Sequence, residues 1–176
     1  KKLNKFCIIS CFLILALGSL FPADAYSQAI GFSIANKTVV EKDTFQVVLN
    51  ADSLFTGRSV FSYKFGITYN SSYLEYLGVD SVGSMLKSWG TPTINSSSAG
   101  TVILAGAGTT ALSGKGGFLY LRFRAIRAGW TNVDWNASQS MLNEGSPSIS
   151  FKYGYVNATS MPFPDIWPDN AEIFVG

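Results

Sequence analysis

Apolar and polar residues alternate with a period of two through most of this chain, and this pattern limits the folds that it can adopt. The clearest runs are residues 45–50, 61–69, 119–125 and 148–155. Successive side chains of a strand point to opposite faces, so each run predicts a strand with one buried face. In the second run the apolar face, which we expect to lie in the core, comprises Phe61, Tyr63, Phe65, Ile67 and Tyr69.

Turn-forming segments separate these runs, and helical periodicity is missing between them. Asn, Ser and Gly gather at residues 70–72, 95–100, 114–117 and 143–145, where they favour turns. Many short strands without crossover helices exclude a parallel α/β fold. We therefore expect an all-β protein, an antiparallel β-sandwich with jelly-roll topology and about nine strands.

The first residues have the pattern of a secretory signal peptide. Lys1, Lys2 and Lys5 precede an apolar stretch over residues 6–21, and Ala23-Asp24-Ala25 follows as an A-x-A cleavage site. The apolar stretch is shorter than the ~20 residues that span a bilayer. We predict a signal peptide at residues 1–25, with cleavage after Ala29 as the alternative. The mature chain is then secreted or displayed at the cell surface, without a membrane span.

Residue types that most enzymes need are missing from the predicted mature chain. The sequence has no histidine, and both cysteines, Cys7 and Cys11, lie in the predicted signal peptide. This excludes disulfides, thiolate nucleophiles and histidine catalysis, and argues against most transition-metal sites. Removing three lysines from 13 basic residues and one aspartate from 11 acidic residues leaves ten of each. A neutral chain is a poor ligand for nucleic acid.

A glycine-rich stretch at residues 101–117, TVILAGAGTTALSGKGG, resembles a phosphate-binding loop. Such loops work at the start of a helix, whose amide groups hold the phosphates. Here Leu112-Ser-Gly-Lys-Gly-Gly prevents a helix and leads into the next predicted strand. Gly116 also stands where a P-loop places the Ser or Thr that binds magnesium. We expect no nucleotide site, no cofactor and no enzymatic activity.

The order of several segments resembles that of cohesin modules, the dockerin-binding β-sandwiches of cellulosomal scaffoldins and related exported bacterial proteins. The matching segments are residues 41–47 (EKDTFQV), 65–75 (FGITYNSSYLE), 100–107 (GTVILAGA), 114–123 (GKGGFLYLRF) and 142–145 (LNEG). Asn70 and Ser71 stand where the family usually has aspartate and proline. The resemblance covers residues 28–176, with a proline-rich segment at 159–170 that we interpret as an irregular insertion or linker; a following domain that begins there is the rival interpretation. Residues 170–175 resemble the final strand of the family.

The resemblance implies a non-catalytic docking module that binds dockerin-bearing proteins during polysaccharide degradation. Cohesins use one flat sheet face for docking. By matching positions, the resemblance assigns a partner-binding role to Ser62, Lys64, Gly66, Thr68, Gly106, Gly108 and Thr109. The glycine-rich stretch would then be flat because its side chains are small.

Tryptophan residues support an alternative function. Trp130 and Trp135 are five positions apart in one predicted strand, so they point to opposite faces and one of them must be exposed. Exposed aromatic rings on similar jelly rolls hold sugars, which makes Trp89 and Trp130 candidates for carbohydrate binding. A carbohydrate-binding module is therefore the alternative to docking, and a structural adhesion module without a discrete site is a third interpretation.

Overall fold

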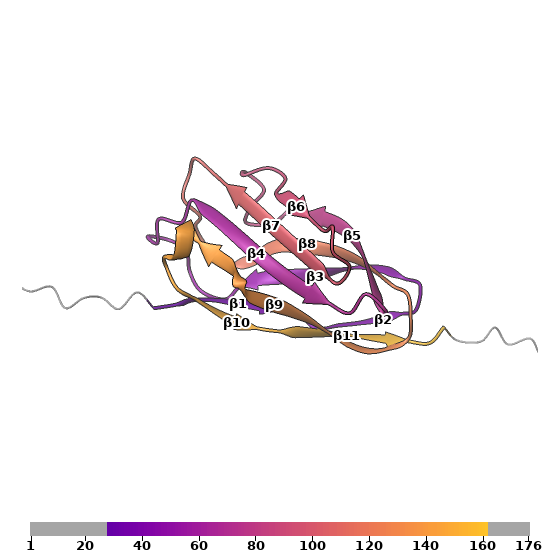
Figure 1. Ribbon diagram of the computed structural model, residues 1–176. Coiled ribbons are helices and arrows are strands. Elements are labelled where there is room, and N and C mark those ends of the chain that lie inside the picture. The colour runs from indigo at the N-terminus through magenta and orange to yellow at the C-terminus, as the bar shows by residue number, and fades with distance from the viewer. Residues whose placement is uncertain (1–27, 162–176) are drawn as a thin grey trace, which may run out of the picture.

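Two β-sheets pack face to face in the computed structural model, which describes residues 28–161 (Figure 1). The five-stranded sheet has the order β10-β1-β3-β8-β5. Its strands are β1 (Ile30–Ile34), β3 (Thr44–Ala51), β5 (Leu74–Asp80), β8 (Gly116–Ala125) and β10 (Ile149–Lys152). The six-stranded sheet has the order β2-β11-β9-β4-β7-β6. Its strands are β2 (Lys37–Val40), β4 (Ser62–Tyr69), β6 (Thr93–Asn95), β7 (Thr101–Ala107), β9 (Gly129–Leu142) and β11 (Gly154–Thr159).

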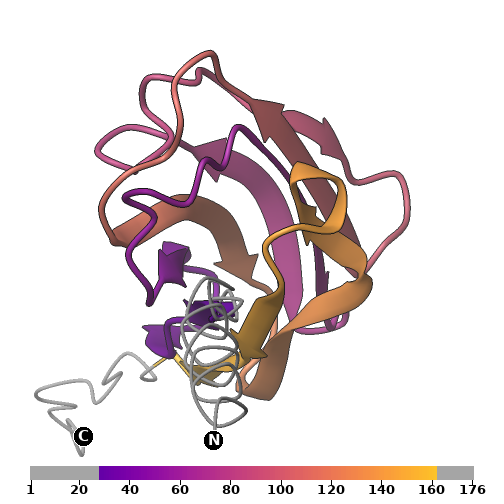
Figure 2. The same ribbon diagram turned by 90° about the vertical axis from the view of Figure 1, so that its left-hand side faces the viewer.

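Most connections cross from one sheet to the other, so consecutive strands generally lie in different sheets. This gives the double-sheet sandwich expected from the sequence. Over the described residues the sandwich has eleven strands, where about nine were expected. The only helical element there is the 3-10 turn η1 (Asn143–Gly145). Both sheets curl around a shared interior, as the end-on view shows (Figure 2).

The first two and the last two described strands run side by side. In both pairs of strands the chain passes from the five-stranded sheet to the six-stranded sheet. β1 pairs with β10 in parallel, with Ile30 opposite Ile149, and β2 pairs with β11 in the same register, with Lys37 opposite Val156. Between the two pairs, the side-chain oxygen of Asn36 accepts a hydrogen bond from the Tyr155 amide at 3.1 Å. These pairings close the sandwich along one side, at the bottom of Figure 1.

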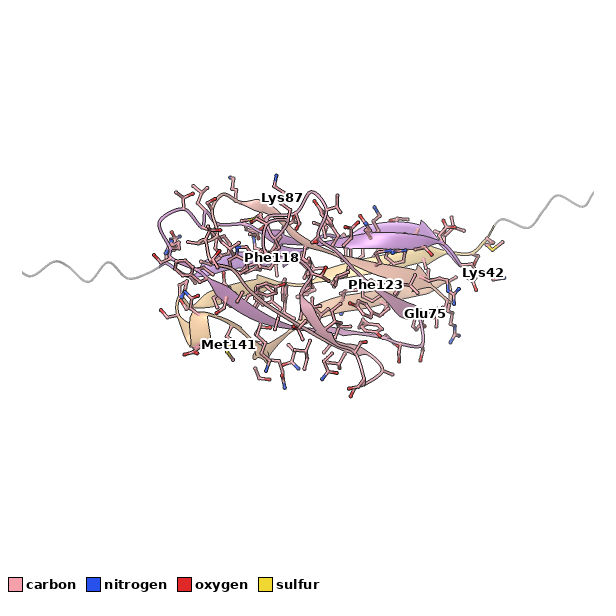
Figure 3. All side chains as sticks on the ribbon, turned by 90° about the horizontal axis from the view of Figure 1, so that it is seen from above. Lys42, Glu75, Lys87, Phe118, Phe123 and Met141 are labelled. Atoms are coloured by element: carbon pink, nitrogen blue, oxygen red, sulfur yellow. The ribbon has the colours of Figure 1, made fainter. Side chains whose placement is uncertain are left out.

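Aromatic rings fill much of the interior. Phe32, Phe65 and Phe118 are completely buried, with ring centroids 4.8 to 5.3 Å apart. Tilted and edge-to-face pairs of this kind add to the hydrophobic stabilisation from burial. Phe118 and Phe123 come from β8 and lie between the sheets (Figure 3). The alternation predicted for β8 is confirmed, because Leu121 and Phe123 are buried whereas Arg122 is exposed.

Three expectations about the buried faces are wrong. Phe61 is 43% exposed, because β4 begins one residue later, whereas Tyr63, Phe65 and Ile67 are buried as expected. Tyr155, expected on the buried face of the run at 148–155, lies half-buried against the exposed Trp130 instead. Tyr153 was expected on the same buried face. It is 68% exposed, because the chain leaves the five-stranded sheet there and enters the six-stranded sheet. The predicted signal peptide at 1–25, most of the proline-rich segment at 159–170 and the expected strand at 170–175 lie outside the described residues.

Candidate functional site

The outer face of the six-stranded sheet carries most of the residues predicted to bind a partner. β4 lies inside this sheet, between β9 and β7, and runs in front of the five-stranded sheet in Figure 1. Its inward side chains are buried, so Ser62, Lys64 and Thr68 lie half-buried on the outer face. Strands with hydrogen-bonded neighbours on both sides hold their side chains in fixed positions, which suits a binding surface.

Lys64 stands in a row of uncharged side chains that crosses four strands. It lies opposite Ala105 on β7 and Met141 on β9, and Ala105 in turn lies opposite Thr93 on β6. Figure 3 shows Met141 projecting from this side of the sandwich. The neighbouring row on β6 and β7 places Asn95 opposite Ile103. Because Ala105 and Thr93 are small, the β6–β7 side of this row is flat, with the lysine ammonium as the central charge of the row.

Charge is sparse over the whole outer face of β4, β6, β7 and β9. Among the outward positions of these strands, only Lys64 and Asp134 carry a charge. Asp134 lies directly opposite Thr68 on β4. Lys64 is four positions earlier on the same strand, so the two charges are well apart. A partner on this face would be recognised mainly through shape and neutral hydrogen bonds. An acidic group of the partner could pair with Lys64, and a basic group could pair with Asp134.

Gly66 does not lie open on this face as the sequence suggested. A bulge in β9 places residues 137–140 opposite a single residue of β4, between the pairs Lys64–Met141 and Gly66–Asn136. The Gly66 amide donates a hydrogen bond to the Ser140 hydroxyl at 3.1 Å. A Cβ added to Gly66 would stand 2.7 Å from Cβ of Gln139. The bulge therefore buries Gly66 and forms a raised border beside Lys64.

Gly106 and Gly108 also differ from their expected positions. Gly106 lies opposite Tyr63, whose side chain points inward, and an added Cβ would stand 2.7 Å from the tyrosine ring. At Gly108 an added Cβ would overlap the indole of Trp89. Both glycines thus allow aromatic rings to pack on the inner side of β7, so the expectation that they flatten the outer face is wrong. Thr109 is exposed in the loop that follows.

The glycine-rich stretch begins as β7, and its second part, residues 108–115, connects β7 to β8. After β7 the chain forms a loop and enters β8 at Gly116, without a helix. The loop is anchored by hydrogen bonds from the Gly108 amide to the Phe61 carbonyl at 2.9 Å and from the Leu112 amide to the Val60 carbonyl at 2.8 Å. The arrangement lacks the helix N-terminus that a phosphate-binding loop requires.

The three described tryptophans have different surroundings. Trp135 is buried, and its indole N–H donates to the Lys152 carbonyl at 3.0 Å. Trp89 stacks on Tyr63 with ring centroids 6.2 Å apart, and its N–H donates to the Thr110 carbonyl. This packing makes Trp89 part of the fold and removes it as a sugar platform. Trp130 is 65% exposed on the outer face, so the expected opposition of Trp130 and Trp135 is confirmed.

Trp130 has outward-facing neighbours that the sequence interpretation missed. Asn132 and Asp134 follow it at alternate positions of β9, and Tyr155 of β11 packs against its ring. The alternation in residues 130–134 would have identified the first two residues. Tyr155 could not be found in this way, because its position depends on the pairing of β9 with β11.

The described part of the chain offers neither a cluster of metal ligands nor a membrane-spanning helix. No three His, Cys, Asp or Glu residues among positions 28–161 lie close enough together to hold a metal ion. Over the same positions no helix is long and apolar enough to cross a membrane.

Comparison with known proteins relates this fold to one group of solved structures. No protein family model matches the sequence, and no curated protein matches it. The sixth cohesin of scaffoldin B from Acetivibrio cellulolyticus, solved in complex with a Cel5 dockerin, is 17% identical, with a TM-score of 0.61; the match covers 74% of this chain and 99% of that one. The OlpC cohesin of Clostridium thermocellum, also solved with a dockerin, is 14% identical, with a TM-score of 0.63 and coverage of 80% and 99%.

A third similar structure comes from a different kind of protein. The cohesin module of a family 33 glycoside hydrolase from Clostridium perfringens is 13% identical, with a TM-score of 0.63, and the match covers 76% of this chain and 98% of that one. In all three comparisons the match spans almost the whole solved module. The chain therefore has the fold of a cohesin module.

Proposed function

We propose that this chain is a non-catalytic docking module that binds dockerin-bearing proteins through the outer face of its six-stranded sheet. The observation that carries the proposal is the flat row around Lys64, on a sandwich whose fold matches cohesin modules solved with dockerins. The proposed contact residues are Ser62, Lys64, Thr68, Ala105 and Thr93. Thr109 is a further contact proposed at the end of β7.

The chemistry of this face favours a largely uncharged partner surface with one acidic or carbonyl-rich position. Ala105 and Thr93 allow close approach of a partner backbone, and the ammonium of the half-buried Lys64 can form a charge-assisted hydrogen bond with an oxygen acceptor. A single charge at the centre of a flat contact contributes more to orientation and selectivity than a charge at its rim. Lys64 is therefore the position at which we expect partner choice to be decided.

The residue inventory supports a binding role over a catalytic one. Without histidine in the sequence, a histidine-activated serine or a histidine acid–base pair cannot operate. We further propose that residues 1–25 direct export and that the module acts outside the cell or on its surface, where dockerin-bearing enzymes degrade polysaccharides.

Calorimetric titration tests the proposal. The chain is titrated with each dockerin module encoded by the same organism, and we expect saturable binding with one dockerin per chain. Failure of every dockerin to bind would contradict the docking function. Assays on glycans, esters and nucleoside triphosphates should remain at background, and turnover in any of them would contradict the non-catalytic interpretation.

A further inference from the structure

A second distinct feature of the outer face is a shallow hollow of about 530 Å³ at the end of β4 and the beginning of β9. Its lining includes Thr68, Asn70, Trp130, Asn132 and Asp134. Lys64 lies four positions before Thr68 along β4, which corresponds to roughly 13 Å. The hollow therefore has a different centre from the row around Lys64, with Thr68 at the border between them, and its proposed ligand does not depend on the docking function.

An aromatic ring, that of Trp130, lines one side of this hollow, and a second ring, that of Tyr155, packs against it from outside the lining. Trp130 is 65% exposed, and its ring centroid lies 4.8 Å from that of Tyr155, with the planes tilted by 38°. Asn132 lies opposite Tyr155 in the pairing of β9 with β11, and Trp130 lies opposite Asn157. The two rings are thus diagonal neighbours across two paired strands, and Tyr155 supports an indole that is otherwise open to solvent. An exposed, supported aromatic ring of this kind is a platform for a flat apolar surface.

Polar groups surround the platform and are held in place by the fold. Asp134 accepts a hydrogen bond from the Trp135 amide at 2.8 Å through one carboxylate oxygen, and it lies opposite Thr68. Asn70 accepts from the Ser72 amide at 2.9 Å, which orients its side-chain amide. Asn132 is exposed between Trp130 and Asp134 on the same face. Two amides, one hydroxyl and one carboxylate are therefore gathered beside the aromatic pair.

We infer that this hollow binds a neutral sugar residue of a glycan. A pyranose ring has an apolar C–H face that can lie on the indole, and hydroxyl groups at its rim that both donate and accept hydrogen bonds. Amide and hydroxyl side chains also do both, so Asn70, Asn132 and Thr68 match that rim. Small-molecule sites are usually lined by apolar and aromatic side chains together with a few fixed polar groups.

The charge of the hollow selects among glycans. Asp134 is the one ionisable side chain among the outward-facing residues that line it, and no basic residue does so. Uronic acids and sulfated sugars would meet a like charge without a compensating cation, so the site favours neutral sugars. A methylated ammonium group is the competing ligand, because aromatic rings with a carboxylate attract cations. Such a cation would leave the amides without hydrogen-bond partners.

The inference can be tested by titrating the chain with neutral hexasaccharides of glucose, xylose and mannose, and with a galacturonic acid hexasaccharide and a trimethyllysine peptide as competitors. Calorimetry measures affinity, and tryptophan fluorescence reports contact with the exposed indole. We expect at least one neutral hexasaccharide to bind. Trp130→Ala and Asn132→Ala should weaken that binding by about tenfold or more, whereas Trp130→Phe should keep most of it. Tyr153→Ala, at an exposed tyrosine outside the hollow, is the matched control and should change affinity by less than about twofold.

Several results would overturn the inference. These are no binding of any neutral hexasaccharide, binding that Trp130→Ala leaves unchanged, or tighter binding of the galacturonic acid hexasaccharide. Binding of the trimethyllysine peptide that depends on both Trp130 and Asp134 would assign the hollow to a cation instead. Dockerin titration of Trp130→Ala and sugar titration of Lys64→Glu keep the two sites distinguishable, because each variant should lose one activity and retain the other.

Discussion

Tyr63 on β4 lies directly opposite Gly106 on β7, and a Cβ added to Gly106 would stand 2.7 Å from the tyrosine ring. Tyr63 is buried and stacks on Trp89, so the glycine makes room for an aromatic layer on the inner side of β7. Gly106 is consequently a packing residue of the sandwich, on the side of β7 that faces away from the proposed docking surface.

The first prediction concerns this close contact. Gly106→Ala should lower the free energy of unfolding by about 1 to 3 kcal/mol, because the methyl group forces the Tyr63 ring to move within a packed core. Ala107→Ser, one position along on the exposed side of the strand, is the control and should change it by less than about 0.5 kcal/mol. Chemical denaturation of both variants provides the comparison. Equal stability of the two variants would contradict the inward placement of Gly106.

The second prediction compares two phenylalanines from the same alternating run. Phe65 is completely buried and its ring contacts those of Phe32, Phe118 and Trp135. Phe65→Ala should cost about 3 to 5 kcal/mol of unfolding free energy through the cavity it leaves. Phe61→Ala should cost much less, because Phe61 is 43% exposed. Melting curves measure the difference, and a larger loss at Phe61 would contradict the placement of β4.

The third prediction concerns Asn143, at the start of the 3-10 turn after β9. Its side-chain oxygen accepts hydrogen bonds from the Phe61 and Ser62 amides at 2.8 and 3.1 Å, and its side-chain nitrogen donates to the Ser59 carbonyl at 2.8 Å. Asn143→Ala removes all three bonds and should cost about 2 to 3 kcal/mol. Asn143→Asp retains the acceptor and should cost less. An alanine variant as stable as the parent chain would refute this anchoring role.

The fourth prediction concerns stability at alkaline pH. Burial, with a smaller contribution from Tyr69, raises the pKa of Tyr76 from its ordinary value of 10.0 to about 12, and burial also raises the pKa of Tyr63. The folded chain then holds these protons at a pH where the unfolded chain has released them. Unfolding free energy should therefore be unaffected by these groups below about pH 10 and should fall as pH rises above it.

Phenylalanine substitutions test the origin of this alkaline loss. The Tyr76 hydroxyl is buried without a hydrogen-bond partner among the described residues, so Tyr76→Phe should stabilise the chain by up to about 1 kcal/mol at neutral pH. The same variant should lose less stability between pH 10 and 12, and adding Tyr63→Phe should reduce the loss further. Denaturation across this pH range measures the slope. A slope that neither substitution alters would assign the alkaline loss to other groups.

Alternation along the sequence predicted the buried side of β4 well, because a one-residue slip would place Lys64 in the core. It also predicted the opposition of Trp130 and Trp135 in β9. The inward position of Gly106 was available from the same rule, since Val102 and Leu104 precede it at alternate positions and are buried. The resemblance of the glycine-rich stretch to a flat docking surface led instead to the wrong side of β7.

Other features depend on tertiary pairing and could not be read from local pattern. The bulge at residues 137–140 buries Gly66 only because β9 is paired to β4 on both sides of it. The exposure of Tyr153 follows from the change of sheets between β10 and β11, which the parallel pairing with β1 and β2 fixes. At this change the inward-facing positions shift by one residue, from odd-numbered positions in β10 to even-numbered positions in β11. The unbroken alternation of residues 148–155 contains no local sign of this shift.

Reversing the charge of Lys64 tests whether the face around this residue binds the partner. Lys64→Glu is compared with Arg122→Glu, which makes the same charge change on an exposed position of β8 in the other sheet. Calorimetric titration with a dockerin that binds the parent chain should show affinity lowered by about 2 kcal/mol or more for Lys64→Glu, with the melting temperature nearly unchanged. Arg122→Glu should bind like the parent chain. Parent-like binding by Lys64→Glu, or a greater loss in Arg122→Glu, would contradict the account.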